Sequence, residues 1–361
     1  MDKSIPGNKK RLFHIDGIKG LLCYLIMLGH FWNLCRWCNP DGPLVNRFTN
    51  FINNSILGET LFSATFWMYA FLVISGYLIS GSKIRTIKEL IVKSINRYIR
   101  FYILIFGACV FIFIIGRTIG FHTADTMEYF SNDWFQSYYR GVYGKRALVI
   151  EPFRALFKGG CEFNAPFWVM KDILLASIII YFCIYMEKIS DKLHWGCLLF
   201  AVLIQRPVIM ACLAGYIMGR YKDKIRCEVV MAVLAVLFVG LFLLRRYGIM
   251  PVMFNEYPLF TVFYCFLLVV VERVDFLKRF FGNKFFQFMG KLSFGVYSFH
   301  WPVICSVGSV VLVVGLSHGI NGSIVYLMSF IASILATTIL AVIYSYSVEK
   351  IAGKIHLPLK K

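Results

Sequence analysis

Apolar runs about as long as a membrane is thick recur along the whole chain, and this feature restricts its fold most strongly. A membrane-spanning helix needs roughly 20 mostly apolar residues. Lipid admits only helices and closed barrels, because every backbone polar group must be satisfied internally. Of the 361 residues, 59% are hydrophobic and 16% are charged. We therefore predict an all-α polytopic membrane protein in which residues 1–361 form a single membrane domain, with no soluble domain.

We predict about ten transmembrane helices in this domain. Residues 196–219 are broken by Gln205, Arg206 and Pro207, and basic segments flank them on both sides, so two short helices meeting at a break are expected there. The other eight are expected at residues 17–35, 61–80, 101–115, 167–186, 229–244, 259–271, 292–316 and 323–346.

The net charge of +19 is concentrated in short segments between the apolar runs. The clearest is KIRTIKELIVKSINRYIR, residues 83–100, with six basic residues and one acidic residue. Cytoplasmic segments of membrane proteins carry such an excess of Lys and Arg. We therefore predict that residues 83–100 and both termini are cytoplasmic, and nucleic acid is not expected as a partner. The first fifteen residues lack the apolar stretch of a signal peptide.

The eleven cysteines lie mostly within apolar runs, where Cys acts as a small apolar residue. Cys35 and Cys38 form a CxxC pair without two further ligands nearby, so no metal site is expected. An external disulfide between them remains open. Residues 117–165 form one long aromatic-rich loop, and loops of this length are usually functional or flexible.

The first apolar run contains a polar stripe, in the stretch DGIKGLLCYLIMLGHFW. At about 100° and 1.5 Å per residue, Lys19 and His30 lie on nearly one helix face, about 16 Å apart in depth, and Asp16 lies close to the same face. Ionisable residues inside a membrane usually mark functional sites. The alternative is that Asp16 and Lys19 reach the interface and only His30 is buried.

Polar residues recur in two later runs. Ser293, Tyr297 and His300 share one helix face, which suits either a site or hydrogen bonding between helices. Lys171 and Asp172 either act in chemistry or neutralise each other, and Trp168 suits the outer interface.

Two further motifs have a structural and a functional interpretation. Ser75 and Gly76 are more typical of helix packing than of a nucleophile. Arg97 and Arg100 could hold a phosphate-rich ligand from inside or could serve only to set orientation.

Five stretches in order resemble motifs of the acyltransferase 3 family of multi-pass membrane O-acyltransferases. They are IDGIKGLLCYLIMLGH, FLVISGYLIS, RYIR, PFWVMKDIL and MGKLSFGVYSFH. Each motif alone is weak, but five in order are specific. The chain departs from the family where Lys19 replaces the commoner Arg, where Phe294 replaces the usual Tyr, and after Glu349, where the usual Pro is missing.

The resemblance implies an O-acyltransferase, usually an acetyltransferase, in the cell (inner) membrane. It implies a cytoplasmic acyl-CoA donor, with acetyl-CoA expected, and a carbohydrate acceptor such as a polysaccharide or lipopolysaccharide. No bound cofactor is expected. The main alternative is a transporter or flippase, which would also carry charges at mid-membrane.

Site roles follow from the resemblance and from the needs of acyl transfer. The expected catalytic residues are His30, His300 and Asp172, with His30 as general base or acyl carrier. The expected donor-binding residues are Lys19, Arg97 and Arg100. Residues expected to support them are Asp16, Ser75, Trp168, Lys171, Ser293, Tyr297 and Glu349.

Overall fold

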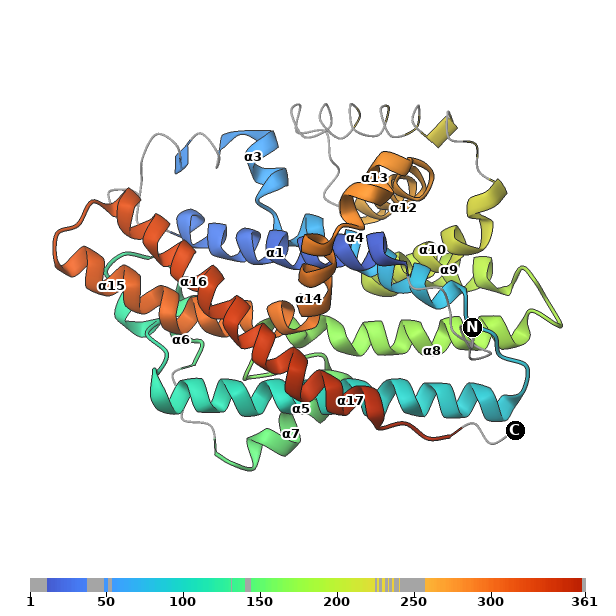
Figure 1. The fold of residues 1–361 in the computed structure, drawn as a ribbon, viewed down its shortest axis with the longest axis horizontal. Helices are drawn as coiled ribbons and strands as arrows, with labels where there is room; N and C mark the ends of the chain where they lie inside the picture. The colour runs from blue at the N-terminus through green and yellow to red at the C-terminus, as the bar shows by residue number, and fades with distance from the viewer. Residues whose placement is uncertain are drawn as a thin grey trace, which may run out of the picture.

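The chain folds into a bundle of helices (Figure 1). A computed structural model describes residues 12–37, 49–50, 54–130, 132–139, 144–224 and 257–358, with a few isolated residues between 226 and 240. These residues form helices and no strand, which confirms the all-α fold class. The predicted span at 229–244 falls almost wholly outside the described residues, as does the Cys35–Cys38 pair.

The helices follow the predicted apolar runs. In chain order they are α1 (Phe13–Arg36), α3 (Ile56–Leu61), α4 (Ala64–Ser80), α5 (Ile87–Thr118), η1 (Ala124–Thr126), α6 (Asp133–Ser137), α7 (Ala147–Phe153), η2 (Arg154–Lys158), η3 (Ala165–Val169), α8 (Met170–Met186), α9 (Leu193–Leu203), α10 (Pro207–Tyr221), η4 (Lys222–Lys224), α12 (Tyr257–Arg273), α13 (Asp275–Phe281), α14 (Lys284–Val303), η5 (Ile304–Gly308), α15 (Ser309–Ser317), α16 (Gly322–Tyr344), η6 (Ser345–Glu349) and α17 (Lys350–Lys354).

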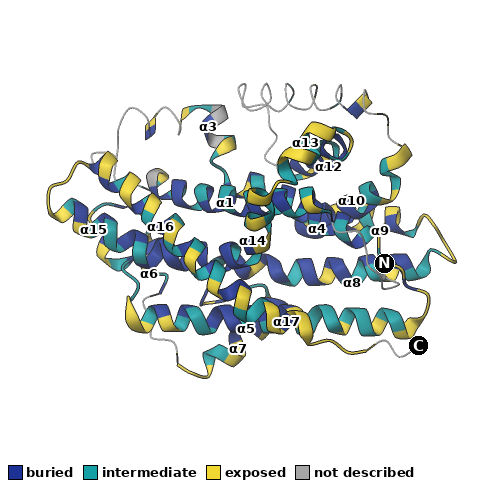
Figure 2. Ribbon diagram, in the orientation of Figure 1, coloured by how far each residue is buried: buried dark blue, intermediate teal, exposed yellow. Residues whose placement is uncertain are grey.

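Five helical segments of the described chain are long and apolar enough to cross a membrane. Their outward faces are apolar as well, as lipid contact requires; in α16, for example, Ile331 and Leu335 are exposed (Figure 2). The five segments are Phe13–Leu34, Ile87–Thr118, Ala165–Met186, Lys284–Ser317 and Gly322–Lys354.

The long helix α5 continues through the basic segment that the sequence suggested as a connection. It begins after Thr86, whose side chain accepts a hydrogen bond from the backbone N–H of Glu89, and it runs for 32 residues. Such a helix is about 48 Å long, well beyond the roughly 30 Å of a bilayer core. A spanning helix of this length extends beyond the bilayer core, and Lys88 in its first turns is exposed.

The predicted break within 196–219 is present. The helix α9 ends at Leu203, and Gln205 takes the left-handed conformation with φ of 52°. Pro207 then opens α10, a position where its missing N–H costs nothing. At this tip an Arg206 Nη1 lies 3.8 Å from the Asp172 Oδ1 of α8. The two short helices thus form a hairpin beside α8.

The connections expected to be cytoplasmic gather at one end of the bundle, on the right of Figure 1. The Lys188 Nζ donates to the Arg85 carbonyl at 2.6 Å, joining the segment after α8 to the start of α5. Asn96 of α5 binds the backbone of Leu357 through two hydrogen bonds, so the C-terminal tail lies along the basic segment. These contacts place the basic segments and the tail on the same side.

The segment expected to be one long loop is folded: η1 and α6 lie at the opposite end of the bundle, whereas α7 packs along α5, with the Phe153 ring 4.8 Å from the Tyr102 ring (Figure 1). Its described part contains η1, α6, α7 and η2. The backbone N–H of His122 donates to the Cys305 carbonyl at 3.0 Å, and the hydroxyl of Tyr139 donates to the Phe163 carbonyl at 2.6 Å. The first bond holds the segment against η5, and the second ties its middle to the residues just before η3.

Glycines let α1 and α14 approach closely. A Cβ on Gly20 would lie 2.3 Å from the backbone N of Gly290, and a Cβ on Gly290 would lie 2.3 Å from the Asp16 carbonyl oxygen. Gly29 meets the backbone of Ala64 in the same way. This close packing at Gly20 and Gly29 holds the polar face of α1 against its neighbours.

Replacing Gly20 by Val is expected to destabilise the protein. The new side chain would overlap backbone atoms, which cannot move aside as a flexible side chain can, and overpacking costs about 1–3 kcal/mol or more. The thermal midpoint of the purified variant, measured in detergent, should fall below that of wild type. Gly196→Val is the control, because a Cβ there meets nothing within 4 Å. Equal midpoints for the two variants would contradict the close contact.

Candidate active site

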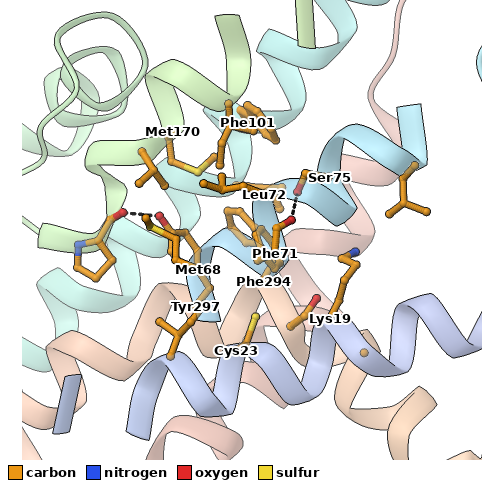
Figure 3. Close-up of a pocket in the computed structure, with 18 of the residues that line it drawn as sticks. Lys19, Cys23, Met68, Phe71, Leu72, Ser75, Phe101, Met170, Phe294 and Tyr297 are labelled. Carbon is orange, nitrogen blue, oxygen red and sulfur yellow. Dashed lines mark hydrogen bonds between the residues drawn. The ribbon is translucent and has the colours of Figure 1, made fainter. Parts of the chain in front are cut away.

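A cavity of about 560 Å³ lies among α1, α4, α5, η3, α8, α14 and η6 (Figure 3). One face of α1 forms a wall of it. Asp16, Lys19, Cys23, Ile26 and His30 all line it, at the spacing of successive helical turns. The polar stripe therefore faces a cavity within the protein, which we call the inner cavity.

Basic side chains crowd the end of the inner cavity nearest the start of α1. Lys19, Arg97, Arg100 and Lys291 line it, against the two carboxylates of Asp16 and Glu349. Lys19 interacts electrostatically with Arg97, Arg100 and Asp16. In Figure 3 its side chain rises from α1 into the cavity. The excess of positive charge favours an anionic ligand.

Arg97 is held in place, and one of its N–H groups donates to no described residue. Its guanidinium carbon lies 4.4 Å from the centroid of the Phe101 ring, a distance suited to a cation–π contact. Its Nε is buried and has no hydrogen-bond partner among the described residues. A buried donor without a partner is costly, so a ligand that accepts from it would be favoured. Arg100, three residues later, is more exposed.

Glu349 supplies the negative charge opposite these cations. It ends the π-helical turn η6, and such turns are frequent at functional sites. Its Oε1 is buried and accepts from no group in the part of the chain that the structure describes, and its electrostatic neighbours are Arg100, Lys19 and Lys291. Glu349 is thus the counter-ion of the basic cluster.

A second cavity of about 430 Å³ also borders His30, and part of the folded 117–165 segment lines it. We call it the outer cavity. Three residues line both cavities: His30, Pro166 and Trp168. The outer cavity is also lined by Tyr138, Arg154, Gly160, Cys161, Glu162, Ala165 and Trp301.

His30 lies where the two cavities meet and is flanked by two rings of α14. The His300 ring is stacked on it, with centroids 5.1 Å apart and planes 30° apart. The Trp301 ring meets it edge-on at 5.7 Å. These contacts fix the plane of the His30 imidazole between the cavities.

His300 itself is fully buried and lines neither cavity. Its Nδ1 is 3.1 Å from the Val296 carbonyl oxygen, which can only accept, so Nδ1 carries the proton. Its Nε2 is buried, and no described residue forms a hydrogen bond with it. His300 is placed to orient His30 from behind.

Tyr297 links α14 to the turn that separates the cavities. Its hydroxyl donates to the Pro166 carbonyl in η3, as the dashed line in Figure 3 shows. Ser293 lies one turn earlier and also lines the inner cavity. The predicted shared face of Ser293, Tyr297 and His300 thus points towards the site.

Ser75 lines the inner cavity, but its hydroxyl donates to the Phe71 carbonyl of its own helix at 2.8 Å. The neighbouring Gly76 packs against the Cys212 backbone of α10, where a Cβ would lie 1.8 Å from the carbonyl oxygen. The packing interpretation of this motif therefore fits the structure.

The cluster at the start of α8 is divided. Trp168 lines both cavities and is 47% exposed. Lys171 and Asp172 line neither. The ion pair that Asp172 makes among the described residues is with Arg206, so mutual neutralisation with Lys171 is not what the structure shows. Asp172 is a structural contact of the α9–α10 hairpin in this arrangement.

Sequence reasoning missed an ionic cluster in the outer cavity. Arg154 donates through Nη1 to Glu151 at 2.7 Å and to Glu162 at 2.5 Å, and the Glu162 backbone N–H donates to Glu151 at 2.6 Å. The bonds to Glu162 and Glu151 hold the pKa of Arg154 above its usual value. Little in the sequence indicates this cluster, because three charged residues in a long loop are common.

Comparison with known proteins gives one result. The model of an acyltransferase domain family matches residues 13–346, from the first residue of α1 into η6. No curated protein and no solved structure matches the chain. The matched region includes every residue that lines the two cavities except Glu349.

Proposed function

The chain belongs to this acyltransferase family, and on that premise we propose that it transfers an acetyl group from cytoplasmic acyl-CoA to a hydroxyl of a cell-surface carbohydrate. The observation that carries the proposal is the place of His30 between a basic inner cavity and a separate outer cavity. A donor and an acceptor could each enter from its own side and meet there. Family membership also favours acyl transfer over the transporter alternative.

The acyl-CoA donor is assigned to the inner cavity because this cavity carries an excess of positive charge. Acyl-CoA carries several phosphate oxygens, and Arg97, Arg100 and Lys19 offer charge-assisted hydrogen bonds to them. The Nε–H of Arg97, which donates to no described residue, supplies a hydrogen bond to a phosphate oxygen in the inner cavity. The acyl end of the donor would then extend along the α1 face towards His30.

His30 would perform the chemistry by one of two routes. As a general base it takes the proton of the acceptor hydroxyl; the oxygen attacks the thioester carbon, the C–S bond breaks, and the proton passes to the leaving thiolate. As an acyl carrier, an imidazole nitrogen attacks the thioester carbon first, the C–S bond breaks, and CoA leaves as the thiol with the N–H proton of the ring. The acceptor oxygen then attacks the acyl carbon, the N–C bond breaks, and the hydroxyl proton returns to the ring.

Neighbours of His30 would position it rather than react. His300 and Trp301 hold the ring plane, and Tyr297 anchors the η3 turn that carries Pro166 and Trp168. Precise orientation of a base contributes much of its effect on rate. Lys171 and Asp172 lie outside both cavities, so neither contacts substrate in this proposal.

We place the inner cavity on the cytoplasmic side because its basic end adjoins the Lys- and Arg-rich connections. Both termini would then be cytoplasmic and the membrane would be the cell (inner) membrane. Acyl-CoA is also found on this side, so the distribution of charge and the location of the acyl donor indicate the same side of the membrane.

The direct test uses surface glycans. Cells with and without the gene are compared by mass spectrometry of their polysaccharide and lipopolysaccharide, alongside release of CoA thiol by the purified protein given acetyl-CoA. The proposal predicts a glycan that loses one acetyl group when the gene is removed, and acetyl-CoA consumption by the protein. Unchanged glycans together with inert acetyl-CoA would overturn it.

A further inference from the structure

We propose that the outer cavity is the acceptor site and that it selects an uncharged sugar over an anionic one. This inference rests on the proposed function, which places the acceptor on the far side of His30 from the donor. The cavity borders His30 directly, so a hydroxyl held there could reach the imidazole. What the cavity would accept follows from the aromatic and charged groups that line it.

The aromatic side chains suit a sugar ring. Trp168, Trp301 and Tyr138 all line the outer cavity. Aromatic rings offer large apolar faces against which the C–H face of a sugar can pack, while the polar groups around them fix its orientation. Trp168 is 47% exposed, so much of its indole remains available.

The charged side chains decide which sugar fits. Glu151 is buried, with 3% of its side chain exposed, and Arg154 is bonded to both Glu151 and Glu162. The three together carry one net negative charge. Within the described chain, Arg154 is the sole Lys or Arg that lines this cavity. Lys171 is close, since a Cβ added to Gly159 would lie 3.4 Å from its Cδ, but it does not line the outer cavity. No lining cation is therefore left for a carboxylate or phosphate on the acceptor.

Glu162 is the group that an acceptor would meet. Its side chain is 52% exposed, whereas Glu151 is covered. A carboxylate accepts hydrogen bonds from sugar hydroxyls and repels another anion. Glu162 would thus favour neutral polyhydroxylic rings, with no part in the chemical step itself.

The test compares two probes that differ only at C6, where methyl β-D-glucopyranoside carries a hydroxymethyl group and methyl β-D-glucuronide a carboxylate. Binding to the purified protein in nanodiscs is measured by saturation-transfer NMR. We expect wild type to prefer the glucoside by at least about fivefold, the ratio for one like-charge contact through water. Glu162→Gln should bring the two affinities close together, and Glu162→Lys should reverse the preference.

A reversal of preference cannot come from a misfolded protein, so Glu162→Lys keeps the test informative. Glu128→Lys is the control, since Glu128 is also exposed and lines neither cavity. Equal binding of both probes by wild type, or an unchanged preference in Glu162→Lys, overturns the inference. Absence of binding by either probe overturns it too.

Acetyl-CoA consumption by the same preparations separates the two proposals. Consumption without charge preference for the sugars would leave the proposed function standing and refute the acceptor site. A charge-selective sugar site in a protein that neither binds nor consumes acetyl-CoA would support the site and refute the acyltransferase function.

Discussion

Replacing His30 by Ala is expected to lower the rate of acyl transfer by about 10²–10⁴-fold, the usual cost of losing a general base. His30 borders both cavities and is packed between rings rather than bonded into the backbone. Because truncation only enlarges existing cavities, membrane insertion and abundance should stay near wild type. The measurement is the acyl content of the acceptor, taken beside the level of the membrane protein.

Two further variants make this result interpretable. His318→Ala is the matched control, since His318 is exposed in the turn after α15 and lines neither cavity. His300→Ala should reduce transfer less than His30→Ala, because His300 acts through the orientation of its neighbour. Near-wild-type acylation by His30→Ala would refute its role in the reaction. Loss of the folded protein in that variant would instead indicate that the His30 side chain is needed for helix packing.

Replacing both Arg97 and Arg100 by Ala should raise the apparent KM for acyl-CoA far more than it lowers kcat. A hydrogen bond to a charged group contributes about 1.5–3 kcal/mol, and each 1.4 kcal/mol is about tenfold in affinity. We therefore expect an increase of at least about tenfold in KM. Arg97→Ala alone should account for most of it, because Arg97 is stacked on Phe101 and has a buried free donor.

The control for these variants is the double change of Arg85 and Lys88 to Ala. Both side chains are exposed at the same end of the bundle and line neither cavity. If positive charge near the membrane were all that mattered, this pair would raise KM as much as the first pair. An unchanged KM in the Arg97 and Arg100 variant, with normal insertion, would leave those residues as orientation signals only.

The α1 face could be predicted because helix geometry is fixed by local spacing. Asp16, Lys19 and His30 recur at whole numbers of turns within an apolar run, so their common direction needs no tertiary information. The close contacts at Gly20 and Gly29 follow in the same way, since small residues are the ones that permit them.

The partner of Asp172 could not be read from sequence proximity. Adjacent residues on a helix point about 100° apart, so Lys171 and Asp172 do not face each other. Arg206 reaches Asp172 only because the α9–α10 hairpin folds back beside α8. The same reason hid the outer cavity, where Glu151, Arg154 and Glu162 are brought together by short helices without periodic sequence.

The basic segment before residue 101 misled for a different reason. Its charges are typical of a connection, yet Lys and Arg are also good helix formers, and an N-cap at Thr86 starts the helix there. Charge indicated the side of the membrane, while capping and propensity decided the helix boundary.

The central claim is that donor and acceptor enter from opposite sides and meet at His30. Purified protein is reconstituted into sealed liposomes of known orientation, and radiolabelled acetyl-CoA is supplied on the face of residues 83–100 only, with a soluble glycan acceptor only on the other face. The account predicts label on the glycan from wild type, and none above background from His30→Ala. Transfer that requires both substrates on the same face would contradict it.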